Sequence, residues 1–454
     1  MDYKFGIAVI GAGYVGLVSS ACFAELGFNV VCVDKDQKKI KKLQKGDSSI
    51  HEPSLTPLIQ NNLATGRLKF SESLSEAVLN NDIILIAVGT PITEDKQADI
   101  SEIENAAKEI APLLNSYKII VVKSTVPAGT CRQLLKTIRN LNYHAHFDIV
   151  SNPEFLRAGS GVKDFMMPDR IIIGAEKITI HLMMARLYQS FIDREIPIIQ
   201  TTLESAELTK YAANSFLATK IAFTNEIAHL CEKLNADVHD VLKGVGLDKR
   251  IGKDYLQPGP GFGGSCLSKD ALALTQSARI MDAPVRIIES VLESNKNHKK
   301  IIVEKIISAC FGSVANKRLA ILGIAFKANT DDVRESPALY LISMLQAQGA
   351  ILNLYDPIVK EISLDLNVYW GHDVYDTLNG TDAIIIMTEW EEFRQLDLKR
   401  IRASLRNTII EPTLIDLRNL YSPQEMIKAG IRYCSIGRKT QNIVYKENLE
   451  ESYT

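Results

Sequence analysis

Residues Phe5–Gly16 read Phe-Gly-Ile-Ala-Val-Ile-Gly-Ala-Gly-Tyr-Val-Gly, and this stretch decides the fold. Its first part, Phe5–Ile10, is an apolar run that predicts a buried strand. Gly11, Gly13 and Gly16 come next in the spacing Gly-x-Gly-x-x-Gly, which suits a tight turn whose backbone can approach a ligand closely. This glycine pattern alone is a weak signal, so its meaning depends on the neighbouring elements.

The residues after these glycines complete a strand–helix–strand unit. Apolar residues recur at helical spacing until Gly27, and Asn29–Val33 predicts a second strand that stops at Asp34. In dinucleotide-binding units the pyrophosphate rests on the helix N-terminus, and an acid after the second strand binds the ribose hydroxyls. We therefore predict a dinucleotide site, with NAD favoured over NADP because Asp34 would repel a 2′-phosphate. Lys35 and Lys39 weaken that preference, and a plain turn acid is the alternative interpretation of Asp34.

Three more apolar segments predict strands of the same sheet, and a polar residue follows each of them. The segments are 82–88, 118–122 and 148–150, and they are followed by Thr90, Thr125 and Glu154. Ligands of an open parallel sheet bind beyond the carboxyl ends of its strands. One such residue alone is more often part of a turn, but three in succession predict a site.

A second glycine-rich stretch surrounds one cysteine. Residues Gly259–Asp270 read Gly-Pro-Gly-Phe-Gly-Gly-Ser-Cys-Leu-Ser-Lys-Asp. Apolar periodicity resumes after Cys266, which predicts that this cysteine lies where a loop enters a helix. Lys269 and the helix N-terminus would both favour a thiolate, so Cys266 is placed as a nucleophile. The alternative is a glycine-rich turn around a buried, inert cysteine.

A long helical pattern runs from Glu204 to about Leu234 and would span about 45 Å. Such a helix suits a connector between domains. Because its apolar surface runs nearly all round it, we expect a homodimer whose partner buries part of it. Lys210 and Asn214 lie one turn apart on this helix, where they either serve a site or are solvated surface residues. A second helical stretch is predicted for residues 282–310.

From Arg318 the strand–helix rhythm returns, with strands predicted at 319–322, 351–355, 383–387 and 414–417. The first turn of this part lacks the glycine pattern and offers Lys327 and Arg334, as if it bound a nucleotide through side-chain charge. Solvated loop charges are the alternative. The predicted fold class is α/β, with two doubly wound Rossmann-like domains joined by a long central helix. We place the domains at 1–203, 204–315 and 316–438, followed by a polar tail at 439–454.

The composition excludes several classes of protein. The 454 residues are 46% hydrophobic and 23% charged with a net charge of −2, which does not suit a protein that binds nucleic acid or a membrane surface. No apolar run approaches the ~20 residues of a membrane span, and the N-terminus lacks a signal-peptide pattern. The seven cysteines are widely spaced without Cys-x-x-Cys, so we expect a cytoplasmic protein without a disulfide framework or a metal site.

Together these motifs resemble those of the UDP-glucose and GDP-mannose dehydrogenase family, from Phe5 to about Arg438 and in order. The motifs that carry the resemblance are Gly11–Gly16, Ser124-Thr125-Val126-Pro127, Asn152-Pro153-Glu154-Phe155-Leu156-Arg157, Glu207-Leu208-Thr209-Lys210 with Asn214, Gly259–Asp270, and Gly323–Lys327 with Arg334-Glu335-Ser336. Family members for N-acetylated UDP-sugars typically have His-Cys where this chain has Ser265-Cys266. Members for GDP-mannose look similar through the cysteine loop.

The resemblance implies an NAD-dependent, four-electron oxidation of UDP-glucose at C6, giving UDP-glucuronate. It implies that Asp270, or a water that Asp270 orients, acts with Lys210 as the base of the first oxidation. Cys266 would then form a thiohemiacetal stabilised by Lys210 and Asn214, and a second oxidation would give a thioester. Glu154, with Thr125 positioning water, would drive hydrolysis of the thioester.

The resemblance also implies two sets of binding contacts. Contacts with NAD are implied for Gly11, Gly13, Val15, Gly16, Asp34, Lys39, Thr90, Thr125, Lys269 and Arg334. Contacts with the nucleotide sugar are implied for Glu154, Phe155, Leu156, Arg157, Ala158, Lys210, Asn214, Arg250, Tyr255, Leu256, Gln257, Pro258, Gly259, Gly263 and Lys327. Arg250 is expected to reach the sugar, either in the site of its own subunit or in the site of a partner subunit. One departure is Ala158, because the family usually has an acid there. If that acid helps to position nicotinamide or water, this protein must position them in another way or react more slowly.

Two alternatives stay open. One is the same chemistry on another nucleotide sugar, such as GDP-mannose or an N-acetylated UDP-sugar. The other is a regulatory protein that binds nucleotide sugars without turnover. The joint presence of Cys266, Lys210, Asn214, Asp270 and Glu154 speaks against the regulatory protein.

Overall fold

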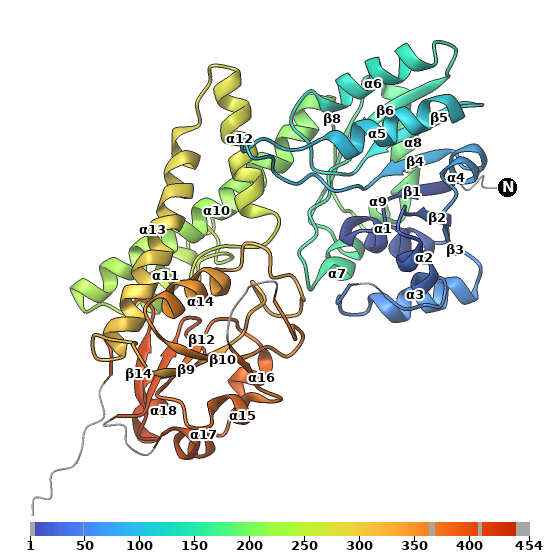
Figure 1. Cartoon of the computed structure of the whole chain (residues 1–454). Helices are drawn as coiled ribbons and strands as arrows, with labels where there is room; N and C mark the ends of the chain where they lie inside the picture. Colours follow the sequence, from blue (N-terminus) through green and yellow to red (C-terminus); the bar gives the residue numbers. More distant parts are fainter. Residues whose placement is uncertain (1–4, 49, 363–367, 407–410, 442–454) are drawn as a thin grey trace, which may run out of the picture. The chain divides into compact units, whose positions relative to one another are not determined.

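The computed structural model describes residues 5–48, 50–362, 368–406 and 411–441, which fold into two compact units (Figure 1). Unit 1 comprises Met1–Ser215 and Lys269–Val285, and unit 2 comprises Phe216–Ser268 and Arg286–Thr454. Two helices, α10 (Leu203–Leu234) and α12 (Leu267–Ile280), contribute residues to both units. The domain boundaries expected at residues 203, 315 and 438 stay a prediction. Most of the expected tail, residues 442–454, lies outside the described residues.

Unit 1 is built on an eight-stranded sheet in the order β3-β2-β1-β4-β5-β6-β7-β8. All neighbouring pairs are parallel except β6 and β7. The strands are β1 (Gly6–Ile10), β2 (Asn29–Val33), β3 (Leu68–Ser71), β4 (Ile83–Ile86), β5 (Lys118–Val122), β6 (Phe147–Ser151), β7 (Ile171–Gly174) and β8 (Ile198–Thr201). The chain winds outward in both directions from β1, and such a switch in strand order marks where open sheets bind ligands.

Helices cover both faces of this sheet because its strands are apolar on both sides. Ile7 and Val9 of β1 pack in one core with residues of α1, α3 and α8, while Ala8 and Ile10 pack in a second core with α4, α5 and α6. The helices of this part are α1 (Tyr14–Glu25), α2 (Gln37–Leu43), α3 (Leu55–Ala64), α4 (Leu74–Asn80), α5 (Ser101–Ile110), η1 (Ala111–Leu113), α6 (Thr130–Leu141), α7 (Gly161–Met166), α8 (Ile178–Leu187) and α9 (Gln189–Ile192).

Unit 2 holds a second, six-stranded parallel sheet in the order β11-β10-β9-β12-β13-β14. Figure 1 shows α14 on one face of this sheet and α15, α17 and α18 on the other. The elements are β9 (Arg318–Leu322), α14 (Pro337–Ala347), β10 (Ile351–Tyr355), β11 (Tyr369–Trp370), α15 (Val374–Leu378), β12 (Ala383–Ile386), α16 (Glu391–Arg394), α17 (Leu398–Ser404), β13 (Thr413–Asp416), α18 (Pro423–Lys428) and β14 (Arg432–Ser435). The predicted α/β fold with two Rossmann-like domains and a long central helix is confirmed.

The helical stretch predicted for residues 282–310 is shorter at its start. The structure has α13 at Arg286–Ala309, preceded by the helix α11 (Val238–Gly246) and by α12. Asp282 has φ 54°, in the left-handed region, and Pro284 restricts the residue before it, so the helix begins only after the proline. Among the helices of the described residues, none is both long and apolar enough for a bilayer crossing.

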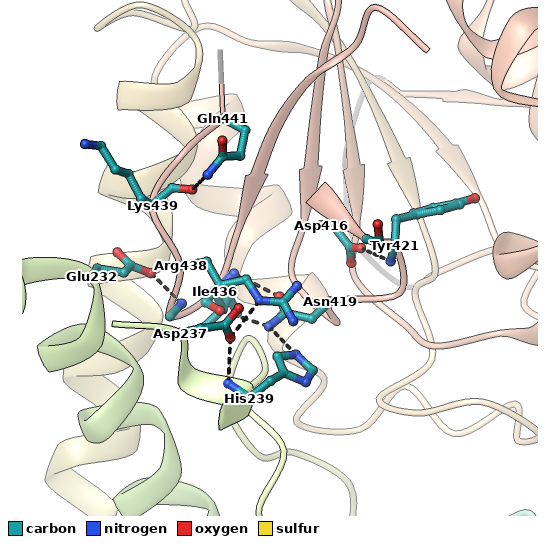
Figure 2. Close-up of polar contacts among 12 residues, drawn as sticks. Glu232, Asp237, His239, Asp416, Asn419, Tyr421, Ile436, Arg438, Lys439 and Gln441 are labelled. Carbon is teal, nitrogen blue, oxygen red and sulfur yellow. Dashed lines mark hydrogen bonds and ion pairs between the residues drawn. The ribbon is translucent and has the colours of Figure 1, made fainter. Parts of the chain in front are cut away.

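The last described residues fasten the second sheet to the end of α10 and the start of α11 (Figure 2). The backbone N–H of Gly437 donates to Glu232 Oε1 at 2.7 Å, and its carbonyl accepts from the N–H of Val238 at 3.0 Å. Arg438 Nε lies 3.0 Å from Asp237 Oδ1. Asn419 contacts both the carbonyl of Ile436 and the ring of His239. These contacts make the C-terminal half of α10 part of unit 2.

Candidate active site

The first turn of unit 1, Gly11–Gly16, has the close backbone packing that the glycine spacing predicts, and we call this turn the cradle. Gly11 has φ 102°, and a Cβ there would lie 2.7 Å from the carbonyl oxygen of Ala87. A Cβ at Gly16 would lie 1.8 Å from the carbonyl oxygen of Gly11, so both positions accept only glycine. At Gly13, by contrast, a Cβ would meet no atom of the described chain within 4 Å. This open position directly before α1 leaves room for a pyrophosphate, so these residues fit a dinucleotide.

Asp34 stands at the end of β2, where a ribose-binding acid is expected. Its Oδ2 atom accepts from the N–H of Ala12 at 2.8 Å and lies 3.1 Å from Lys39 Nζ. Partial burial alone would raise the pKa of Asp34, but the N–H groups of Asp36 and Ala12 and the Lys39 ammonium outweigh burial and lower the pKa below its ordinary value. Asp34 is therefore ionised at neutral pH, as an acceptor for ribose hydroxyls must be.

Glu154 and Lys210 form a buried ion pair in unit 1. Glu154 Oε1 lies 3.2 Å from Lys210 Nζ, and the two side chains are only 6% and 4% exposed. The other carboxylate oxygen of Glu154 accepts from the N–H of Leu156, so both oxygens are held. Two cationic side chains lie over the ring of Phe155, with Arg170 Cζ 3.6 Å and Lys210 Nζ 5.2 Å from the ring centroid. A carboxylate and an amine fixed in this way can transfer protons at a site that is shielded from bulk water.

A second buried polar group lies one helical turn along α10. Asn214 Nδ2 donates to Asp270 Oδ2 at 2.6 Å, and Lys269 Nζ lies 2.6 Å from Asp270 Oδ1. Lys269 also reaches the hydroxyl of Thr90 at 3.5 Å, which ties α12 to the chain after β4. Lys210 and Asn214 are both buried, so the alternative of solvated surface residues is wrong.

Cys266 lies in unit 2, directly before the first residue of α12, as predicted. It is exposed, whereas the other six cysteines are buried, so the alternative of a buried cysteine is wrong. A Cβ at Gly263 would lie 2.2 Å from the carbonyl oxygen of Glu335, and the N–H of Gly264 donates to the carbonyl of Arg334 at 3.0 Å. The cysteine loop thus packs directly on the segment between β9 and α14, and glycine is what makes that approach possible.

Two helices hold the start of the cysteine loop. The N–H of Gly259 donates to Asn225 Oδ1 of α10 at 3.0 Å, and its carbonyl lies 2.7 Å from His298 Nε2 of α13. Asn295 bonds both the N–H and the carbonyl of Phe262, at 2.9 and 3.1 Å. Every one of these side chains is buried, so the loop has a fixed path to the thiol.

Three arginines that were expected to contact ligands are paired within their own loops. Arg157 lies 2.6 Å from Asp164, Arg250 lies 2.6 Å from Asp248, and Arg334 lies 2.7 Å from Asp332. The hydrogen bond to Asp332 raises the pKa of Arg334. All three guanidinium-bearing residues are exposed, so a ligand would have to compete with an existing carboxylate partner.

The other predicted contact residues occupy positions of several kinds. Lys327 Nζ lies 5.8 Å from the ring of Phe326, and Tyr255 has φ 62°. The structure leaves Val15, Thr125, Leu156 and Ala158 half-buried, Leu256 and Pro258 buried, and Gln257 exposed. Taken together, the predicted residues form the cradle, the Glu154–Lys210 pair and the Asn214–Asp270–Lys269 group in unit 1, and the Cys266 loop with Arg334 in unit 2.

Sequence reasoning missed two buried groups in unit 1. Lys123 follows β5 directly and is 5% exposed. Glu52 accepts from the hydroxyl of Tyr14 at 2.6 Å and from the N–H of Gly159 at 2.7 Å, which links the first turn to the segment after Glu154. Lys123 looks like an ordinary polar strand end. Only its place two residues before Thr125, at the ligand edge of the sheet, could have drawn attention to it.

The cradle, the buried acid–base groups and the exposed thiol define the class of this protein, an NAD-dependent dehydrogenase. Three family models then match successive stretches of the chain. They are the NAD binding domain of the UDP-glucose/GDP-mannose dehydrogenase family at residues 5–192, its central domain at 204–297 and its UDP binding domain at 320–423. The chain belongs to the UDP-glucose/GDP-mannose dehydrogenase family. The predicted family and the predicted cofactor, NAD, are confirmed.

Similar proteins of known name cover almost the whole chain. It is 46% identical to UDP-glucose 6-dehydrogenase of Rhizobium meliloti (strain 1021) over 437 residues, 95% of this chain and 99% of that protein. It is also 46% identical to UDP-glucose 6-dehydrogenase TuaD of Bacillus subtilis (strain 168) over 436 residues, 95% of this chain and 93% of that protein. The solved structure of a UDP-glucose dehydrogenase from Pyrobaculum islandicum superposes with a TM-score of 0.86 at 35% identity, covering 93% of this chain and 96% of that one.

Proposed function

We propose that this protein oxidises UDP-glucose at C6 to UDP-glucuronate, using two molecules of NAD⁺ for each sugar. The observation that carries the proposal is an exposed Cys266 on a glycine-held loop, in a chain that also buries the Glu154–Lys210 and Asn214–Asp270 pairs. Relatives at 46% identity named UDP-glucose 6-dehydrogenase support UDP-glucose over other nucleotide sugars.

The first oxidation removes the C6 hydroxyl proton and one hydride. When bound, NAD accepts the hydride of each of the two oxidations. Asp270, or a water that Asp270 orients, acts with Lys210 as the base for the hydroxyl proton. Asp270 is suited to this because Asn214 and Lys269 fix one carboxylate oxygen each.

The second oxidation proceeds through a covalent adduct, because an aldehyde carbon carries no hydroxyl group and must first add a nucleophile before it can lose hydride. The Cys266 thiolate adds to the aldehyde carbon, and the resulting oxyanion is stabilised by N–H donors of Lys210 and Asn214. Oxidation of this thiohemiacetal gives a thioester. Glu154 then takes one proton from a water that Thr125 positions while the water attacks the thioester carbon. The tetrahedral adduct expels the Cys266 thiolate, and the carboxylic acid formed loses its proton to solvent. The adduct keeps the reactive aldehyde bound between the two oxidations.

We propose in addition that the protein works as a cytoplasmic homodimer. Phe216, Phe223 and Leu230 recur every seven residues along α10 and are 65%, 45% and 52% exposed. An apolar stripe of this kind on a helix suits burial against the same stripe of a second copy. The free thiols of all seven cysteines support a reducing compartment.

A substrate panel tests the proposed function. Purified protein is mixed with NAD⁺ and with UDP-glucose, GDP-mannose or UDP-N-acetylglucosamine, and NADH is counted against sugar consumed. We expect two NADH for each UDP-glucose and little turnover of the others. NADH from GDP-mannose or an N-acetylated sugar alone would reassign the substrate, and no NADH from any sugar would refute the enzyme activity.

A further inference from the structure

Lys123, in unit 1, is a buried ammonium whose described hydrogen-bond acceptors are both neutral. Its Nζ atom donates to the carbonyl oxygen and to the side-chain oxygen of Asn152, at 3.3 and 3.1 Å. In the part of the chain that the structure describes, no carboxylate pairs with it. A buried charge held only by neutral acceptors is costly, so a protein that keeps one there gains something in return.

The lysine is linked to the reacting groups through Asn152. The amide of Asn152 is fixed by donating to the carbonyl of Ile172 at 2.7 Å and by a hydrogen bond from the hydroxyl of Tyr188. Glu154 follows two residues later. Lys123 therefore anchors the residue from which the chain turns to present the Glu154 carboxylate.

The lysine also acts on these groups through its charge. Burial lowers the pKa of Lys123 to about 8, the carboxylate of Glu154 opposes that shift, and the ammonium of Lys210 adds to it. These two are the charged groups that face it, with the Tyr188 hydroxyl as a neutral neighbour. A nearby positive charge stabilises a carboxylate and destabilises a second ammonium, which is what two proton acceptors need.

We propose that Lys123 is a positioning residue for the Glu154–Lys210 pair. It aims the carboxylate through Asn152, and its charge favours the proton-accepting forms of both partners. The kinetic consequence of this role rests on the proposed function, whereas the electrostatic coupling does not.

The same strand offers a matched control. Lys118 is the first residue of β5, and Lys123 directly follows the last residue of that strand. Lys118 is also buried, with 3% of its surface exposed. Among the described residues, its Nζ atom donates only to backbone carbonyls, of Leu79 at 3.0 Å and of Asn81 at 2.8 Å, and the charge that acts on it is Asp82. If buried lysines here only satisfied hydrogen bonds, the two positions would behave alike.

The coupling is measured first, without turnover. The protein is labelled with ¹³Cε-lysine, the Lys123 signal is assigned by its loss in Lys123→Met, and its titration is followed by NMR. We expect its midpoint to fall in Glu154→Gln and to rise in Lys210→Met, by about half a pH unit or more, while the Lys118 signal stays unchanged. Opposite shifts in the two variants cannot come from general loosening of the fold. An unchanged Lys123 midpoint in both would overturn the proposal.

Kinetics then test the consequence. At about pH 7 we expect Lys123→Met to lower kcat about tenfold, and above about pH 9, where wild-type Lys123 is largely neutral, this defect in the kcat ratio to the wild type should shrink severalfold, because only the lost hydrogen bonds to Asn152 still distinguish the two proteins. Lys118→Met should give a ratio that does not change with pH. A constant ratio for Lys123→Met would refute the charge role. A wild type that oxidises no nucleotide sugar would instead refute the proposed function and leave the NMR result standing.

Discussion

His298 Nε2 lies 2.7 Å from the carbonyl oxygen of Gly259, at the start of the loop that carries Cys266. Because a carbonyl can only accept, Nε2 of His298 carries a hydrogen, and in the neutral ring Nδ1 then accepts from His229 Nε2, 2.8 Å away. The two hydrogen bonds can thus be made with both rings neutral. Burial lowers the pKa of His298 to about 4, although the bond to Gly259 opposes the shift.

This arrangement predicts that acid weakens unit 2. Between about pH 6.5 and pH 4 the unfolded chain binds a proton at His298 that the folded chain does not, so stability falls as the pH falls. From pH 6.5 to pH 5 the loss should reach about 1–2 kcal/mol. Thermal unfolding followed across this range should show a smaller drop in Tm for His298→Gln, which keeps a donor for Gly259. His146→Gln, at an exposed position, is the control, and equal pH slopes in all three proteins would contradict the prediction.

The two glycines Gly13 and Gly16 should fail for different reasons when changed to alanine. Gly13→Ala places its Cβ in open space, so the fold should keep its Tm, but the methyl group occupies the room expected for pyrophosphate. We expect the Kd for NAD to rise about tenfold or more. Gly16→Ala drives its Cβ against the carbonyl of Gly11 and should lower Tm in the absence of NAD. Calorimetric NAD titrations and thermal scans separate the two effects. Full NAD affinity in Gly13→Ala would show that the pyrophosphate of NAD does not bind at this position of the cradle.

How much of this could be read from the sequence depends on how local each feature is. The strand, the glycine turn and Asp34 lie within one continuous unit, so their pattern predicted the cradle. The hydrogen bonds that hold the cysteine loop join Gly259 to Asn225 and His298, which lie 34 and 39 residues away in the sequence. No spacing rule marks those side chains. Lys123 escaped notice for a similar reason, since a polar residue after a strand is usually solvated, and burial is decided by the packing of other elements.

Asp34→Asn should weaken NAD binding without unfolding unit 1. The asparagine keeps an oxygen for the N–H of Ala12, but it loses the charge that pairs with Lys39 and that we expect to bind ribose hydroxyls. Charge-assisted hydrogen bonds are worth about 1.5–3 kcal/mol, so the Kd for NAD should rise about 10- to 100-fold. Asp36→Asn, which changes only the cap of α2, is the matched control and should leave the Kd unchanged. Equal affinities in Asp34→Asn and the wild type would show that the acid is only a turn residue.

Cys266 should be the one thiol that a small alkylating reagent reaches in the folded protein, because the other six cysteines are buried. Mass spectrometry after brief iodoacetamide treatment should find a single adduct, on Cys266, and UDP-glucose should slow its formation. The alkylated protein should bind NAD normally and release no UDP-glucuronate. Cys266→Ser should likewise lose net formation of UDP-glucuronate by at least about a hundredfold, because an alcohol is a far weaker nucleophile and leaving group than a thiolate. A Cys266→Ser variant that makes UDP-glucuronate at the parent rate would contradict the covalent step. A variant that stalls after one oxidation or at a serine ester would support it.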